Sequence, residues 1–322
     1  MEKPKVGFYW CASCGGCEEA VLDLNEDILK VVDAVDIIFW PVALDFKKKD
    51  VESMEDGSVT VSFINGAVRL SEQEEVVKLL RKKSGLVVAF GSCAHMGGIP
   101  ALANISNKNE IFKRAYKKVP SVVNLEEIYP QEKVKLDVGE LELPSFYNTV
   151  KPLDRVVDVD YYLPGCPPPP DLIMKAVNAI LEGKLPPKGA VIAPDKTLCE
   201  TCERNKTKPD KLKIKEMKRI FEIVSDDEKC FLEQGIICLG PATRTGCGER
   251  CIKGNMPCRG CFGPTDSVID QGAKFLSALA SIIDTNEQGE IQSIVETIPD
   301  LIGTFYRFSL ASSLLKRKKL EA

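Results

Sequence analysis

Short apolar runs alternate with helical patterns along the first half of the chain. The runs at residues 6–10, 35–42 and 86–91 are bounded by charged residues or glycine, as is typical of buried parallel strands. After Glu18 and Glu19, apolar residues recur at three- and four-residue steps. They predict a helix through Ala20, Val21, Leu24, Ile28, Leu29 and Val32.

A second helix is expected before the third strand. Ser71 and Glu74 predict a capping box at its start, and its apolar face continues through Val77 and Leu80. This alternation of strands and helices predicts an α/β fold with a doubly wound parallel sheet.

The pattern changes after Cys166. Prolines 167–170 cannot continue a strand and lead instead into a helix at residues 172–180. Residues 188–264 hold eight of the 13 cysteines and show little periodicity, so we expect bound metal rather than an apolar core to stabilise them. Helices are expected again near 267–283 and 291–315. The chain therefore divides into a first domain at 1–187 and a second, irregular, cysteine-rich domain with helices at 188–322.

The amino-acid composition argues against some classes of function and favours others. The 322 residues are 44% hydrophobic and 28% charged, as in an ordinary globular protein, and the net charge of −4 gives no argument for nucleic-acid binding. No export signal follows Met1, and no apolar run approaches the ~18 residues needed to span a bilayer. We therefore expect a cytoplasmic protein without a membrane span. Disulfides seldom persist there, so 13 cysteines indicate metal or redox chemistry.

The first cysteine group follows strand ends. Cys14 and Cys17 lie in a glycine-containing turn after the first strand, Cys93 follows the run at 86–91, and Cys166 precedes Pro167. Loops at the carboxyl ends of parallel strands converge in one crevice, so these four thiolates could hold one 4Fe-4S cluster. Alternatively, Cys93 and Cys166 are only small buried residues.

A second group of eight thiols follows without a histidine. Two four-cysteine zinc sites fit the number, and so do iron–sulfur clusters. Spacing alone does not separate them, but the first group, which is typical of a redox site, favours iron–sulfur. The eight are Cys199, Cys202, Cys230, Cys238, Cys247, Cys251, Cys258 and Cys261.

Four motifs resemble those of nickel–iron hydrogenase small subunits. Three are similar to that family's proximal-cluster motifs, and the fourth is similar to its last cluster motif. They occur in family order between residues 14 and 262. In this chain they read Cys14-Gly15-Gly16-Cys17-Glu18-Glu19, GSCAHMGGIP at 91–100, Gly165-Cys166-Pro167-Pro168 and PCRGCF at 257–262.

The resemblance implies a flavodoxin-like N-terminal domain and three 4Fe-4S clusters with four cysteine ligands each. The proximal cluster would use Cys14, Cys17, Cys93 and Cys166. The distal cluster would use Cys199, Cys202, Cys230 and Cys238. The medial cluster would use Cys247, Cys251, Cys258 and Cys261. Many relatives have a histidine in place of Cys199 and lack Cys251. The additional thiolate and the fourth iron site that this chain would have both tend to lower the cluster potentials.

The resemblance also implies a function. In this family a separate large subunit splits hydrogen at a nickel–iron centre, and the small subunit carries the electrons away. This chain is most similar to the cytosolic branch, in particular the methyl-viologen-reducing (F420-non-reducing) hydrogenases of methanogens. The implied partners are the large subunit, an iron–sulfur acceptor subunit and heterodisulfide reductase.

Three alternatives remain open. The chain could belong to another cytosolic hydrogenase, of the F420-reducing or sulfhydrogenase type. The second is the cluster subunit of respiratory complex I. That type usually has two adjacent cysteines in its first motif, whereas Ser13 precedes Cys14 in this chain. A zinc-stapled scaffold without redox function is the third.

A few further residues stand near the motifs. Cys11 is expected to be a buried spectator thiol, His95 a packed side chain, and Glu19 either a helix N-terminal acid or a residue facing the large subunit.

Residues 204–219 contain eight basic and two acidic residues and could steer an acidic acceptor, although a solvated helix face is the simpler interpretation. The basic run at 316–319 predicts a solvated tail.

Overall fold

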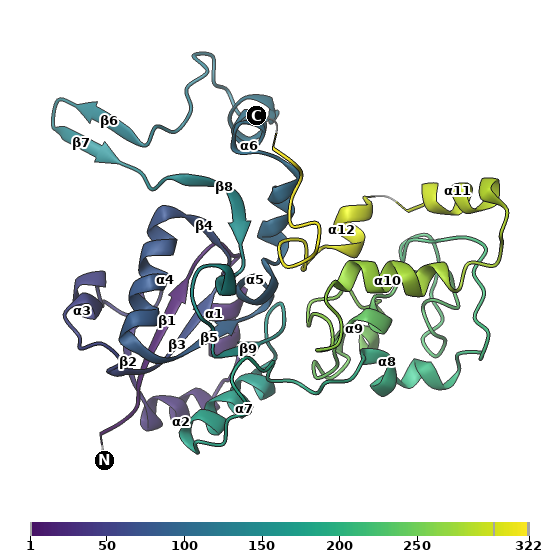
Figure 1. The fold of residues 1–322 in the computed structure, drawn as a ribbon, viewed down its shortest axis with the longest axis horizontal. Helices are drawn as coiled ribbons and strands as arrows, with labels where there is room; N and C mark the ends of the chain where they lie inside the picture. The colour runs from purple at the N-terminus through teal and green to yellow at the C-terminus, as the bar shows by residue number, and fades with distance from the viewer. Residues whose placement is uncertain (1, 299, 321–322) are drawn as a thin grey trace.

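A parallel sheet forms the centre of the N-terminal part of the chain (Figure 1). Within residues 2–298 and 300–320, which this computed structural model describes, five strands make up the sheet in the order β2-β1-β3-β5-β9. This confirms the doubly wound α/β fold, and the order is that of flavodoxin-like sheets. The strands are β1 (Lys5–Trp10), β2 (Asp36–Phe39), β3 (Val59–Asn65), β5 (Ser84–Phe90) and β9 (Tyr161–Leu163).

Helices cover both faces of this sheet. One face carries α1 (Gly16–Leu22), α2 (Asp27–Ala34) and α7 (Pro170–Leu181), and the other carries α3 (Lys48–Glu52), α4 (Ser71–Lys83) and α5 (Ser92–Met96). Alternate strand residues serve the two cores: Phe63 packs in the first and Ile64 in the second. Every strand is therefore covered on both sides, which explains the continuous apolar runs.

The structure differs from the expected helices at two places. The helix expected after Glu18 is two helices, because the chain turns between α1 and α2, where Asn25 has φ 51°. At the start of α4 the cap lies one residue earlier than expected. The Gln73 side chain, not Glu74, accepts the main-chain N–H of Leu70, while the Ser71 hydroxyl accepts the N–H of Ser145.

An insertion between β5 and β9 supplies three of the four strands of two small antiparallel sheets, and β4 (Val68–Leu70), which precedes β5, is the fourth. β4 pairs with β8 (Phe146–Lys151), and β6 (Lys133–Leu136) pairs with β7 (Gly139–Glu142) as a hairpin that projects from the body (Figure 1). The other helices of the N-terminal part are short. They are the 3-10 helices Ile99–Ile105 and Leu153–Arg155, α6 (Lys108–Lys113) and the π-helix Arg114–Lys118.

The C-terminal part contains short helices joined by irregular chain. It has an apolar core of its own, which includes Phe231, Leu239 and Phe275, so the expectation that metal alone would stabilise it is wrong. Instead of one helix at 291–315 there are two. The helices are α8 (Leu198–Thr201), the 3-10 helices Glu203–Lys206 and Gly240–Ala242, α9 (Arg250–Lys253), α10 (Gln271–Ala280), α11 (Gln288–Glu296) and α12 (Leu301–Phe305).

The end of the chain returns to the N-terminal part. The N–H of Gly98 donates to the Phe308 carbonyl at 3.0 Å, and the N–H of Lys318 donates to the Asn104 carbonyl at 2.9 Å. In Figure 1 this yellow segment ends beside α6. The basic run at 316–319 is therefore docked along its backbone and is not the solvated tail that we expected. Among the described helices, none has the length and hydrophobicity of a membrane span.

Candidate metal-cluster sites

The first cysteine group lies at the carboxyl ends of β1, β5 and β9. Cys14 precedes α1, Cys17 lies in the first turn of α1, Cys93 lies in α5, and Cys166 follows β9. Each of the six pairs of thiols is close enough for the charge of one to raise the pKa of another. The structure thus brings together the four residues that the sequence grouped.

Burial makes these thiols poor candidates for free thiolates. It raises the pKa of Cys93 to about 12 and that of Cys17 further, and the neighbouring thiols raise both values more. A thiol of this kind stays protonated near neutral pH unless a cation stabilises the thiolate. Coordination to metal does so and removes the proton outright.

Two glycines leave room for the sulfur atoms of the first group. A Cβ atom on Gly91 would lie 2.5 Å from the Cys17 sulfur, and one on Gly98 would lie 2.5 Å from the Cys93 sulfur. Both glycines have positive φ, of 84° and 58°, which disfavours any other residue. The loops are therefore shaped around the thiols at both positions.

Ser92 joins the first group to the C-terminal part, a role that its sequence position did not reveal. Its hydroxyl lies 2.8 Å from the carbonyl of Gly165 and also contacts the carbonyl of Cys261, and its N–H donates to Gly165 at 2.7 Å. This role follows only from hydrogen bonds to residues that are distant in the sequence, which a motif does not show.

Glu18, beside Cys17, is a second residue that the motif alone did not single out. It is 4% exposed and accepts hydrogen bonds from the Trp40 indole and the Asn65 amide. Burial raises the pKa of this carboxyl, while the two donors oppose the rise. Glu19 is exposed, so the neighbouring acid that points into the protein is Glu18.

Four of the remaining thiols line a single pocket. They are Cys199, Cys202, Cys230 and Cys238. All six pairs among them interact electrostatically, and burial raises the pKa of Cys199 to about 12 and that of Cys238 to about 11. Main-chain N–H groups also point at these sulfurs, including the N–H of Cys258, which lies 3.3 Å from the Cys238 sulfur. The structure therefore groups these four thiols around one space.

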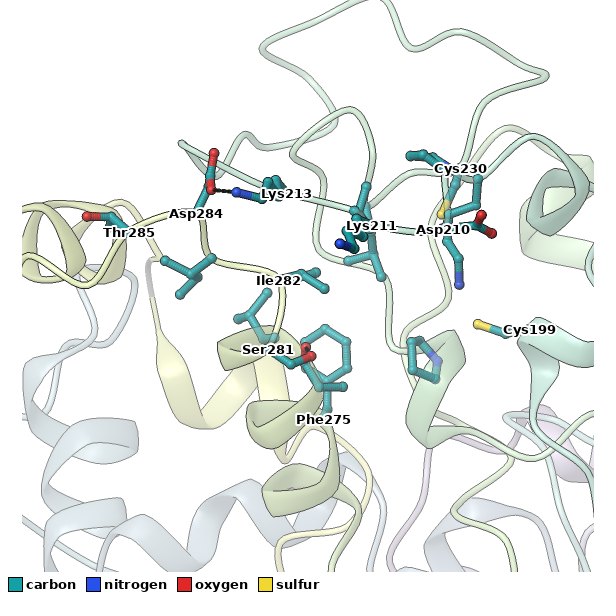
Figure 2. Close-up of a pocket in the computed structure, with 18 of the residues that line it drawn as sticks. Cys199, Asp210, Lys211, Lys213, Cys230, Phe275, Ser281, Ile282, Asp284 and Thr285 are labelled. Atoms are coloured by element: carbon teal, nitrogen blue, oxygen red, sulfur yellow. Dashed lines mark hydrogen bonds and ion pairs between the residues drawn. The ribbon is translucent and has the colours of Figure 1, made fainter.

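This second group opens to the surface on one side. Figure 2 shows a wide groove in which Cys199 and Cys230 lie near Lys211, while Lys213 is ion-paired with Asp284. Lys208 lines the same groove. Its walls come from the chain at 208–213 and from the end of α10 and the residues after it.

The last four cysteines are less closely grouped. Cys247, Cys251 and Cys261 all interact with one another. Cys258 joins them through Cys261 and also lies beside Cys238 of the second group. Burial raises the pKa of Cys261 to about 12.

The three groups follow one another in space. The N–H of Cys166, in the first group, points at the sulfur of Cys261 in the third. Cys258, also in the third group, donates its N–H to the Cys238 sulfur of the second. The group of Cys247–Cys261 therefore lies between the other two and contacts both.

The remaining candidates have structural environments. Cys11 is 4% exposed in an apolar core, and the half-buried His95 packs against Tyr162 with 4.7 Å between the ring centroids. Arg204 lies inside the protein, over the Phe231 ring and bonded to main-chain carbonyls. Residues 204–219 therefore do not form the solvated helix face of the simpler interpretation.

The chain is similar to known proteins over nearly its whole length. The family model described as "NADH ubiquinone oxidoreductase, 20 Kd subunit" matches residues 14–180. The iron–sulfur subunit of the F420-non-reducing hydrogenase of Archaeoglobus profundus is 41% identical over 98% of both chains. The corresponding subunit of the F420-non-reducing hydrogenase of Methanothermobacter thermautotrophicus is 38% identical over 98% of this chain and 97% of its own length.

The chain belongs to the family of these F420-non-reducing hydrogenase subunits. It is thus a hydrogenase subunit and part of an oxidoreductase, which confirms the resemblance drawn from the cysteine motifs. The complex I alternative shares only the matched region at 14–180, whereas the hydrogenase relatives also cover the eight later cysteines.

Solved structures support the same fold. A [NiFeSe] hydrogenase chain from Desulfovibrio vulgaris Hildenborough has a TM-score of 0.52 at 20% identity, covering 82% of this chain and 94% of its own. A chain of an NAD+-reducing [NiFe]-hydrogenase has a TM-score of 0.50 at 26% identity, covering 57% of this chain and 94% of its own.

Proposed function

We propose that this chain is the electron-transfer small subunit of an F420-non-reducing hydrogenase and that it binds three 4Fe-4S clusters. The observation that carries the proposal is the series of three neighbouring thiol groups, of which the middle one contacts both others. Such clusters, when bound, accept and release single electrons. The chain's own part is to hold twelve thiolates in place, bury four of them, and present the two outer groups to partners.

The geometry of the thiols supports clusters over zinc. A structural zinc ion needs its sulfurs about 2.3 Å from one point. In the described part of the chain, no three Cys, His, Asp or Glu side chains converge in a way that could hold one metal ion. The four thiols of the second group line one pocket without meeting at a point, which suits a cluster of several irons, each with one cysteine.

The first group is proposed to face the large subunit. Cys14 and Cys166 are exposed, while Cys17 and Cys93 are buried, so the group opens on one side of the N-terminal part. A large subunit covering this opening would shield the cluster and bring its nickel–iron centre close. Every cysteine of the three groups is then used for iron, which leaves hydrogen activation to the partner.

This assignment predicts no hydrogen chemistry from the chain alone. After anaerobic reconstitution with iron and sulfide, the isolated chain should hold no nickel and should not reduce dyes with hydrogen. Addition of the nickel-loaded large subunit should give hydrogen-dependent dye reduction. Hydrogen-dependent dye reduction by the isolated chain would show that the assignment is wrong.

The Cys199 group is proposed as the exit for electrons. The groove beside it is lined by Lys208, Lys211 and Lys213 and by two acids, Asp210 and Asp284, of which Asp284 pairs with Lys213. The lining is therefore net positive, and positive charge attracts an acidic protein surface. We infer an acidic iron–sulfur acceptor subunit at this groove, with heterodisulfide reductase as the enzyme that finally receives the electrons.

Replacing Cys199 by serine tests this direction. The variant should lose or weaken one cluster and lose acceptor reduction, while hydrogen–deuterium exchange at the large subunit continues, because isotope exchange needs no electron exit. The matched control is Cys11→Ser, which changes a buried thiol outside the groups. Normal acceptor reduction by the variant, in an intact nickel-loaded complex that lacks this cluster, would contradict the assigned direction.

A further inference from the structure

Two arginines, one in β4 and one in the C-terminal segment, lie near each other with no counter-charge among the described residues. Arg69, in β4, is 5% exposed, and none of its three guanidinium nitrogens has a hydrogen-bond partner among the described residues. Arg317, in the C-terminal segment, has a buried Nη2 that also lacks a partner in the described part of the chain. Their charges repel, and burial together with this repulsion lowers the pKa of Arg69 to about 10.

Both guanidinium groups are fixed by their surroundings. Arg69 lies over the Phe146 ring, 4.1 Å from its centroid, and its main-chain N–H donates to Gln73 at 2.8 Å. Arg317 uses Nη1 to bind the Asn148 carbonyl at 2.9 Å and the Thr149 hydroxyl. In both residues, the contacts that hold the side chain in place leave these guanidinium nitrogens without a partner among the described residues.

The acids on the adjoining segments already have partners. Glu74, at the start of α4, pairs with Lys78 and Lys151, and Glu110, in α6, pairs with Lys318. Within the described residues, no carboxylate contributes to the electrostatics of Arg69. A buried cation without an anion or hydrogen bonds is costly, and two of them side by side cost more.

We propose that Arg69 and Arg317 bind a small inorganic oxyanion, of the phosphate or sulfate type. The planar guanidinium offers paired N–H donors that match two oxygens of such an ion. The free nitrogens are buried, which favours a small ion over a large ligand. It would tie the C-terminal segment, through Arg317, to β4 and β8 of the N-terminal part.

Hydrogen exchange of the assembled hydrogenase, followed by mass spectrometry, tests this site. Inorganic phosphate, sulfate and chloride are compared at equal ionic strength. Phosphate or sulfate should slow exchange in peptides from 313–320 and 66–75 by about tenfold at ten times the dissociation constant, and chloride should not. The readout is local and independent of the clusters.

Three variants decide the outcome. Arg69→Gln and Arg69→Met should abolish the anion effect, and Arg69→Met should raise the unfolding temperature in chloride, because it removes an unpaired buried charge. Arg114→Gln, at an exposed arginine, should leave the effect unchanged. Equal protection by all three anions, equal protection of Arg69→Met and wild type, or no protection would overturn the proposal.

Discussion

Replacing Gly91 by alanine is expected to remove the cluster of the first group and lower hydrogen-dependent acceptor reduction by about 10–100-fold, the range seen when a ligand's supporting residue is lost. The new Cβ would lie 2.5 Å from the Cys17 sulfur and 3.4 Å from the Gly165 carbonyl, so the ligand or the loop must move. Iron per chain should fall from about twelve to about eight.

The control for this variant is Gly189→Ala. Gly189 has φ 87°, close to the 84° of Gly91, but a Cβ there meets nothing within 4 Å. Both variants therefore place a non-glycine residue at a positive φ, so backbone strain is present in each of them. Only Gly91→Ala should lose iron, and a full complement of iron with normal activity in it would show that the loop does not enclose a cluster ligand.

Replacing Cys93 by serine is expected to stop hydrogen-dependent acceptor reduction. Cys93 is buried among the other three thiols of its group, so its loss removes one of four ligands and leaves a hydroxyl that holds iron poorly. The low-temperature electron paramagnetic resonance spectrum of the reduced chain should lose one of three signals.

Cys11→Ser is the matched control for Cys93→Ser. Cys11 is 4% exposed and lies just before the turn that holds Cys14 and Cys17, so the exchange alters a buried thiol without touching a proposed ligand. Its iron content should stay at about twelve. If Cys11→Ser lost a cluster and Cys93→Ser kept all of them, the ligand set of the first group would be wrong.

The sequence predicted the parts of the fold that depend on local pattern. Buried parallel strands are continuous apolar runs, and the thiols of the first group follow strand ends, so their convergence could be inferred before the structure. The distal group was assigned only through family resemblance, since its members come from irregular chain. The structure places those four around one pocket.

The residues that sequence reasoning misjudged act through long-range contacts. Arg204 looked like one member of a basic stretch, yet it packs over Phe231 and binds carbonyls far away in the chain. Arg317 looked like part of a tail, yet it binds Asn148. Side chains that bond main-chain carbonyls far along the chain leave no periodic pattern, because nothing local requires them.

The most direct test of the central claim is iron, sulfide and zinc analysis of the chain purified without oxygen. The account predicts about twelve irons and about twelve sulfides per chain, four for each thiol group, with no zinc. About four irons per chain, or zinc in stoichiometric amount, would contradict it.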